Sequence, residues 1–91
     1  LPSERLAQAG DDPEVVVRAI RPPAQGTYLA VINIGLTNKP DARVRLPHSG
    51  AAREVISNRP LSARDGVVSL ALHPCQLLTL HQAPENAAPT R

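Results

Sequence analysis

The sequence has almost no aromatic residues: Tyr28 stands alone, and tryptophan, phenylalanine and methionine are absent. Large aromatic side chains usually dominate the packing energy of cores and interfaces, so the core of this protein must be aliphatic. The same absence argues against two kinds of binding protein. Single-strand nucleic-acid binders stack bases on aromatic rings, and carbohydrate-binding modules stack sugars on exposed Trp or Tyr. Tyr28 begins an apolar segment and is expected in the core, so we expect no nucleic-acid partner and no direct carbohydrate contact.

Cysteine and long apolar runs are also scarce. Cys75 is the single cysteine, so no internal disulfide can form and the cellular compartment is left open. No apolar run approaches the ~20 residues of a membrane helix, and no basic segment followed by an apolar one marks a signal peptide. We therefore expect no membrane partner. Because the chain begins at Leu1 and contains no methionine, we expect either a processed protein or a domain cut from a longer polypeptide, and we favour the domain.

What the chain does contain is the composition of one small folded domain. Its 91 residues are 42% hydrophobic and 20% charged, which is enough for a single modest core. The net charge is +2, and nearly all the basic residues are arginines. Because acidic residues nearly balance them, the arginines are interpreted as a solvated surface.

Apolar segments of strand length alternate with turn residues along most of the chain. The expected strands are residues 14–21, 28–35, 42–47, 51–57, 67–72 and 76–81, with a short edge strand around Leu61. The last two flank a turn centred on Pro74 and are expected to form a hairpin. No helix is expected. The pattern predicts an all-β fold, a small antiparallel β-sandwich of about six to eight strands spanning residues 14–83. Residues 1–13 would be a linker and residues 84–91 a disordered tail.

The segment 28–35 is apolar on both faces of a strand. Tyr28 and Ile32 point one way, and Leu29 and Val31 point the other. A strand of this kind is usually central and covered on both sides. The second cover could be the facing sheet of the same domain or a neighbouring domain. We favour the neighbouring domain, with Tyr28, Leu29 and Val31 as the candidate docking face.

No group of residues has the pattern of a catalytic or metal site. The acidic residues lie mostly in turns and in the expected linker, whereas hydrolases often need two carboxylates at the reacting bond. His48 and His73 are interpreted as turn residues and His81 as a strand end, with no second ligand pair for zinc. Cys75 lacks the third partner of a cysteine nucleophile and is expected to be a small buried thiol. We assign no catalytic, cofactor-binding or metal residue, and no cofactor.

Three segments share a pattern of motifs. Residues 28–35 read Tyr, four apolar residues, Asn, one residue and Gly; residues 55–61 read Val-Ile-Ser-Asn-Arg-Pro-Leu; residues 66–80 contain Leu-x-Leu-x-Pro. Between about residues 15 and 81, the chain resembles the small all-β domain that ends many multidomain glycoside hydrolases. One departure is Cys75, since the position after Pro74 is often aromatic in such domains.

The resemblance implies a non-catalytic domain that packs on and stabilises the catalytic domain of the same polypeptide. The catalytic acids of such enzymes lie on a (β/α)₈ barrel, so no catalytic residue is carried over to this chain. One alternative is a free-standing β-sandwich module for binding or adhesion, which an exposed concave face with Tyr28 or clustered arginines would favour. Another is an enzyme in its own right, which would need a deep pocket with two converging carboxylates.

Overall fold

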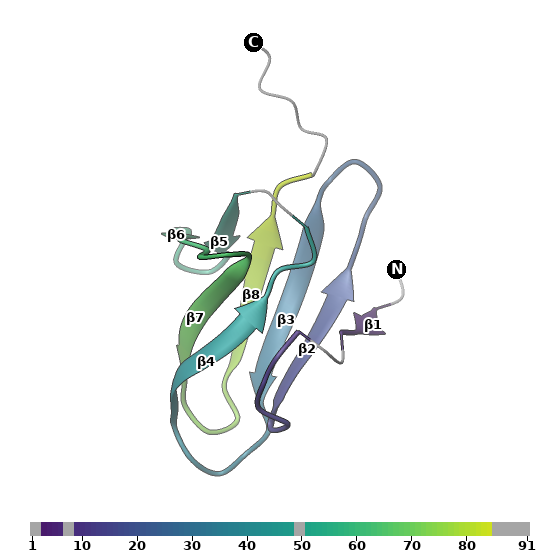
Figure 1. Ribbon diagram of the computed structural model, residues 1–91. Helices are drawn as coiled ribbons and strands as arrows, with labels where there is room; N and C mark the ends of the chain where they lie inside the picture. The colour runs from purple at the N-terminus through teal and green to yellow at the C-terminus, as the bar shows by residue number, and fades with distance from the viewer. Residues whose placement is uncertain (1–2, 7–8, 49–50, 85–91) are drawn as a thin grey trace.

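The computed structural model describes residues 3–6, 9–48 and 51–84, and these form eight β-strands and no helix (Figure 1). All strand pairs are antiparallel. The strands are β1 (Glu4–Arg5), β2 (Val15–Ile20), β3 (Thr27–Asn33), β4 (Lys39–Arg45), β5 (Ala52–Glu54), β6 (Arg59–Leu61), β7 (Val67–Leu72) and β8 (Leu77–Gln82). The predicted all-β antiparallel sandwich is confirmed.

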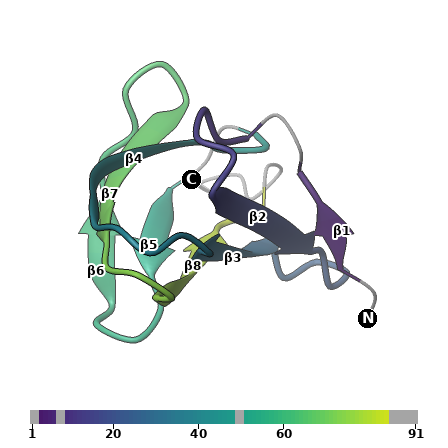
Figure 2. The ribbon, with the colours of Figure 1, turned by 90° about the horizontal axis from the view of Figure 1, so that it is seen from below.

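The strands form two layers. A six-stranded sheet has the order β1-β2-β3-β8-β5-β6, and a two-stranded sheet pairs β4 with β7. Figure 2 shows the larger sheet curving around the smaller one from β1 to β6. β3 lies between β2 and β8, which confirms that the strand with two apolar faces is central.

The core lies between the two sheets and is entirely aliphatic. Strand alternation sends every second residue inward: Val44 is buried while Arg43 and Arg45 on either side are exposed. The buried hydrophobic residues among those described are Ala9, Val15, Val17, Ala19, Leu29, Val31, Ala42, Val44, Leu46, Ala52, Val68, Leu70, Leu72 and Leu80. A core without aromatic side chains was the first expectation from the composition.

Asn33 is a polar residue that is buried together with these aliphatic side chains. It ends β3 and is fully buried. Its amide nitrogen donates to the carbonyl oxygens of Thr37 at 2.9 Å and His73 at 3.0 Å. Its Oδ1 accepts from the backbone N–H of Gly35 at 2.9 Å. One side chain therefore joins the loop after β3 to the turn after β7, which gives the Asn-x-Gly motif a structural reason.

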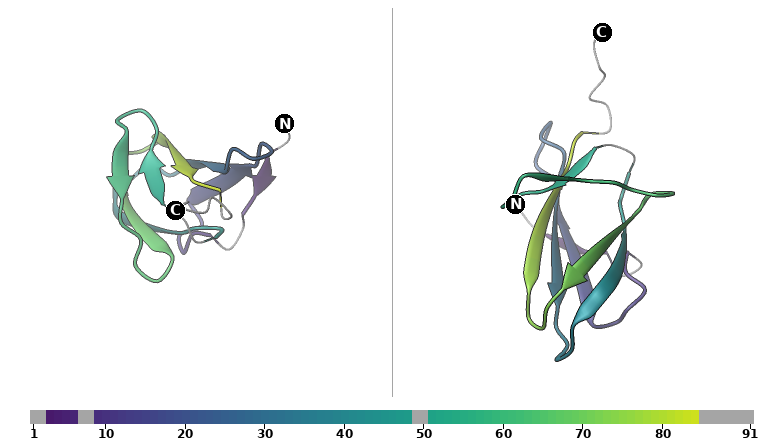
Figure 3. Two further views of the ribbon diagram at one scale, coloured as in Figure 1. Left: turned by 90° about the horizontal axis from the view of Figure 1, so that it is seen from above. Right: turned by 90° about the vertical axis from the view of Figure 1, so that its left-hand side faces the viewer.

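The closing pair of strands does not form the predicted hairpin. β7 pairs with β4 in the smaller sheet, whereas β8 pairs with β3 and β5 in the larger one. The turn between them therefore carries the chain from one layer to the other (Figure 3). The backbone N–H of Gln76 donates to His73 O at 3.1 Å, and Cys75 takes a positive φ of 62°.

The segment expected to be a linker is part of the fold where it is described. Glu4 and Arg5 pair with β2, and Ala9 is buried in the core. Gly10 forms a bridge with Val44 on β4. The structured region thus begins before residue 14. Of the expected tail, residues 85–91 lie outside the described residues.

The expected strand at 51–57 is shorter than predicted. β5 ends at Glu54, whose carboxylate accepts hydrogen bonds from the backbone N–H groups of Ile56 and Ser57, each at 2.9 Å. These bonds turn the chain, so Ile56, expected at the strand centre, is exposed in a turn. The short edge strand around Leu61 is confirmed as β6.

Candidate functional site

The face of the larger sheet that points away from β4 and β7 is called the outer face here. Strand register aligns its residues in rows across β2, β3 and β8. One row is Val16, Ile32 and Leu77; the next is Arg18, Ala30 and Thr79; the third is Ile20, Tyr28 and His81. On the neighbouring strands, Arg5 extends the second row and Arg53 extends the third.

The first row is apolar throughout, and the third row is apolar at Ile20 and Tyr28. Leu77 is 53% exposed and Ile20 is 37% exposed, while Val16, Tyr28 and Ile32 are half-buried. Ala30, in the row between them, is also half-buried. The described residues form two layers, and none of their strands makes a third layer over this face (Figure 2). Apolar side chains gathered on an exposed face of a folded protein are a candidate interaction site. The outer face is therefore the candidate docking site.

The structure changes which residues belong to that site. Leu29 and Val31 are fully buried against the smaller sheet, so these two residues of the predicted docking face are corrected to core residues. Tyr28 is half-buried on the outer face, which corrects its expected place in the core. Its ring lies 4.7 Å from that of His81, and His81 Nε2 lies 2.7 Å from Gln25 O.

Sequence reasoning missed most of the outer face. Ile20 and Leu77 lie on strands that were predicted correctly, but their common face depends on the pairing of β2 and β8 with β3. The available signal was the alternation in β2, where Val16 and Ile20 share a face with Arg18 between them. That signal needs the register of three strands before it becomes a surface.

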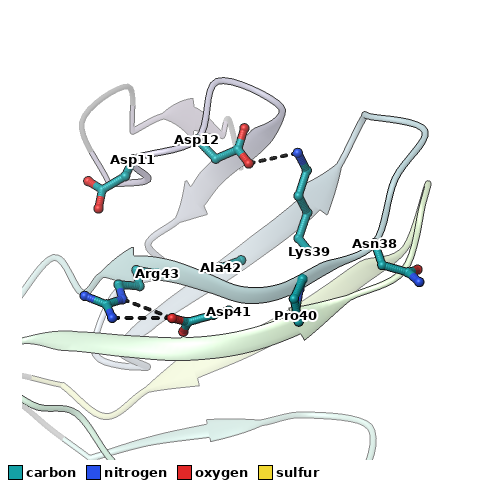
Figure 4. Close-up of a pocket in the computed structure, with 8 residues that line it drawn as sticks. All are labelled: Asp11, Asp12, Asn38, Lys39, Pro40, Asp41, Ala42 and Arg43. Atoms are coloured by element: carbon teal, nitrogen blue, oxygen red, sulfur yellow. Dashed lines mark hydrogen bonds and ion pairs between the residues drawn. The ribbon is translucent and has the colours of Figure 1, made fainter.

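A second candidate site is a groove of about 450 Å³ between the loop before β2 and strand β4 (Figure 4). Lys39 Nζ lies 2.9 Å from Asp12 Oδ2 and 2.7 Å from Glu14 Oε1. These ion pairs tie the loop to β4. The residues lining the groove are Asp11, Asp12, Asn38, Lys39, Pro40, Asp41, Ala42 and Arg43.

The carboxylates in this groove have the electrostatics of structural ion pairs. The Glu14 backbone N–H, followed by Lys39, lowers the pKa of Asp12, and hydrogen bonds to Glu14 and Asp12 raise the pKa of Lys39. A hydrogen bond from Ser69 Oγ, together with nearby Arg43, lowers the pKa of Asp41. A general acid in glycoside hydrolysis needs a raised pKa. Asp12 and Asp41 are therefore unsuited to that role.

The other sequence candidates lie apart from both places. Cys75 is exposed, which corrects its expected burial, and His73 Nδ1 lies 3.3 Å from Asn38 Oδ1. Within residues 3–6, 9–48 and 51–84, no three or more His, Cys, Asp or Glu residues are grouped so as to hold a metal ion. The same part of the chain contains no helix of the length and apolarity needed to cross a membrane.

Comparison with known proteins finds a similar fold in part of a solved structure. No family model and no curated protein sequence matches the chain. Among solved structures, it is similar to part of AmyP, an amylase, in a crystal structure in complex with maltose. The TM-score is 0.68, the identity is 14%, and the match covers 94% of this chain and 18% of the AmyP chain. The chain thus spans less than a fifth of that protein, and the likeness confirms at the level of fold the resemblance seen in the sequence.

Proposed function

We propose that this chain is a non-catalytic β-sandwich domain that packs on and stabilises the catalytic domain of a glycoside-hydrolase-like enzyme on the same polypeptide. The observation that carries this proposal is the outer face of the larger sheet. Its apolar rows run over three adjacent strands, on the side opposite the core. A second domain is the kind of surface that would cover them.

The energy available from such a contact is modest. Burying a fully exposed Leu or Ile side chain contributes about 1.5–3 kcal/mol. Leu77 is about half exposed and Ile20 somewhat less, so each would contribute on the order of 1 kcal/mol. The half-buried side chains of Val16, Tyr28 and Ile32 would add less each. A tethered domain needs no more, because its partner is held at high effective concentration.

The likeness to AmyP supports this role in one respect. A fold of this kind occurs there as a segment covering 18% of a much longer chain. Such a segment is built to have neighbours in its own polypeptide. The ion pairs of Asp12 with Lys39 and of Asp41 with Arg43 also fit a structural role for the groove.

The test is to compare Leu77→Asp with Ala71→Asp in the polypeptide that contains this chain. Both positions are exposed strand residues, but Ala71 lies on the outward side of the smaller sheet. We expect Leu77→Asp to lower the unfolding midpoint of the whole polypeptide by several degrees and Ala71→Asp to leave it nearly unchanged. In the 91-residue chain alone the two variants should behave alike. Equal effects in the whole polypeptide, or a reading frame without a catalytic domain, would overturn the proposal.

A further inference from the structure

The charges of the outer face are all of one sign. Arg18 lies in its middle row, Arg5 lies beside it on β1, and Arg53 lies on β5 opposite His81. Among the strand residues that the structure describes on this face, none is Asp or Glu. On this one face, the apolar rows therefore lie between Arg5 on β1 and Arg53 on β5, with Arg18 in the row between them.

Two of these arginines are held in place by neutral groups. Arg18 Nε donates to Ser3 Oγ at 2.9 Å, and its Nη2 donates to Ser3 O at 3.1 Å. Arg53 Nη1 donates to Asn58 Oδ1 at 3.3 Å. Away from the outer face, by contrast, Arg21 pairs with Glu4 and Arg43 pairs with Asp41. Within residues 3–6, 9–48 and 51–84, the guanidinium groups of Arg18 and Arg53 are thus oriented by neutral groups and pair with no carboxylate.

Two acidic residues at the ends of outer-face strands are committed to other partners. Glu54 follows Arg53 on β5 but is buried, pairs in register with the inward-facing Leu80, and bonds to Ile56 and Ser57. Those bonds, chiefly from Ser57, lower the pKa of Glu54. Glu14 precedes β2 and pairs with Lys39. Neither carboxylate is therefore placed to neutralise an arginine of the outer face.

These charges restrict what can cover the apolar rows. A guanidinium that loses its water without gaining an anionic partner is strongly destabilising. Arginine pairs best with carboxylates, through two parallel hydrogen bonds. A polyanion such as a nucleic acid would neutralise the arginines but would leave the rows of Ile20, Ile32 and Leu77 without an apolar cover.

We propose that the occupant of the outer face is a surface of the catalytic domain that is apolar at its centre and bears carboxylates opposite Arg18 and Arg53. This inference rests on the proposed function and adds the chemistry of the partner to it. The apolar rows supply the contact energy, and the arginines fix which part of the catalytic domain lies against the sheet. Electrostatic complementarity of this kind sets register and specificity.

A zero-length cross-link tests the pairing directly. In the whole polypeptide, Arg18→Lys and Arg53→Lys place an amine at each position, which a carbodiimide joins to a carboxylate in contact with it. We expect peptide mapping to find each substituted position linked to an Asp or Glu outside this chain. The control is Arg45→Lys, an exposed position on the smaller sheet, which should give no such link. Links only to acids within residues 1–91, or none at either position, would overturn the inference.

Charge reversal separates this inference from the proposed function. Arg18→Glu should lower the unfolding midpoint of the whole polypeptide more than Arg18→Gln, and Arg45→Glu should leave it unchanged. High salt should reduce the difference, because the Debye length falls to about 3 Å at 1 M. If Leu77→Asp destabilises the whole polypeptide but Arg18→Glu does not, the docking proposal stands and the carboxylate pairing is wrong. If neither does, both are wrong.

Discussion

Replacing Asn33 with alanine should be among the most destabilising changes at a polar residue of this domain. The side chain is fully buried and makes three hydrogen bonds, two as donor and one as acceptor. Its removal leaves the carbonyl oxygens of Thr37 and His73 and the N–H of Gly35 without that partner. A buried polar group left unsatisfied costs about 1–3 kcal/mol. Because His73 O keeps the N–H of Gln76 as a donor, two groups lose their partner. The expected loss is therefore about 2 kcal/mol or more, a large part of the ~5–15 kcal/mol stability of a typical domain.

Urea unfolding followed by far-ultraviolet circular dichroism measures this loss in the 91-residue chain. The matched control is Asn38→Ala, because Asn38 lies in the same loop region and its side chain makes an exposed contact with His73. Its effect should stay within about 0.5 kcal/mol. A cost below about 1 kcal/mol for Asn33→Ala would refute the argument that this residue joins the two loops.

Asn33→Asp sharpens the same test. The aspartate keeps the acceptor for Gly35 N–H but presents an oxygen, in place of the amide NH₂, to two carbonyl oxygens. Burial and this repulsion would raise the folded-state pKa of the introduced carboxyl above its unfolded value of about 3.9. A raised folded-state pKa gives stability at low pH that is lost as pH rises. The variant should therefore lie closest to the parent protein near pH 4 and furthest from it at neutral pH.

Three further changes test other parts of the fold in the same urea assay. Leu29→Ala should cost about 2–5 kcal/mol in the chain alone, because Leu29 is fully buried; a cost below about 1 kcal/mol would contradict its place in the core. Gly26→Ala should destabilise strongly, since an added Cβ would clash with Gln82 O and the residue has a φ of +83°. Glu54→Gln should reduce the loss of folding stability at acidic pH. Hydrogen bonds lower the pKa of Glu54 below its ordinary 4.5, so the carboxylate stabilises the fold above that pH, and this stabilisation is lost as pH falls through the folded-state pKa. An unchanged acid limb would contradict the role of Glu54.

Periodicity predicted the strands well because alternation is a local property. β2, β3, β7 and β8 appear within one or two residues of their expected ranges, and Val44 faces the core as its neighbours Arg43 and Arg45 required. The strand after β4 was predicted too long because the β-branched pair Val55 and Ile56 favours extended chain. The Glu54 carboxylate overrides that preference by bonding the next two backbone N–H groups.

Alternation within a strand could not predict which strands pair with each other. A turn such as residues 73–76 can close a hairpin or carry the chain from one sheet to the other. The local sequence is compatible with both arrangements. The choice depends on partners distant in the chain: β7 takes β4, and β8 takes β3 and β5. The β1 strand was missed for a related reason, since Glu4 and Arg5 are extended only because β2 pairs with them.

The two apolar faces of β3 show how far the sequence alone could predict the candidate site. The sequence predicts that both faces are covered, but a period of two cannot tell which cover is internal. The fold resolves this by placing Leu29 and Val31 against the smaller sheet, which leaves Ala30 and Ile32 on the outer face. In a separate domain, an apolar row exposed across β2, β3 and β8 would favour aggregation. In the proposed docking, a partner that supplies apolar surface and carboxylates for Arg18 and Arg53 would turn this row into a stabilising contact. The pattern in β3 and the arginines beside it are therefore both explained by one proposed neighbour.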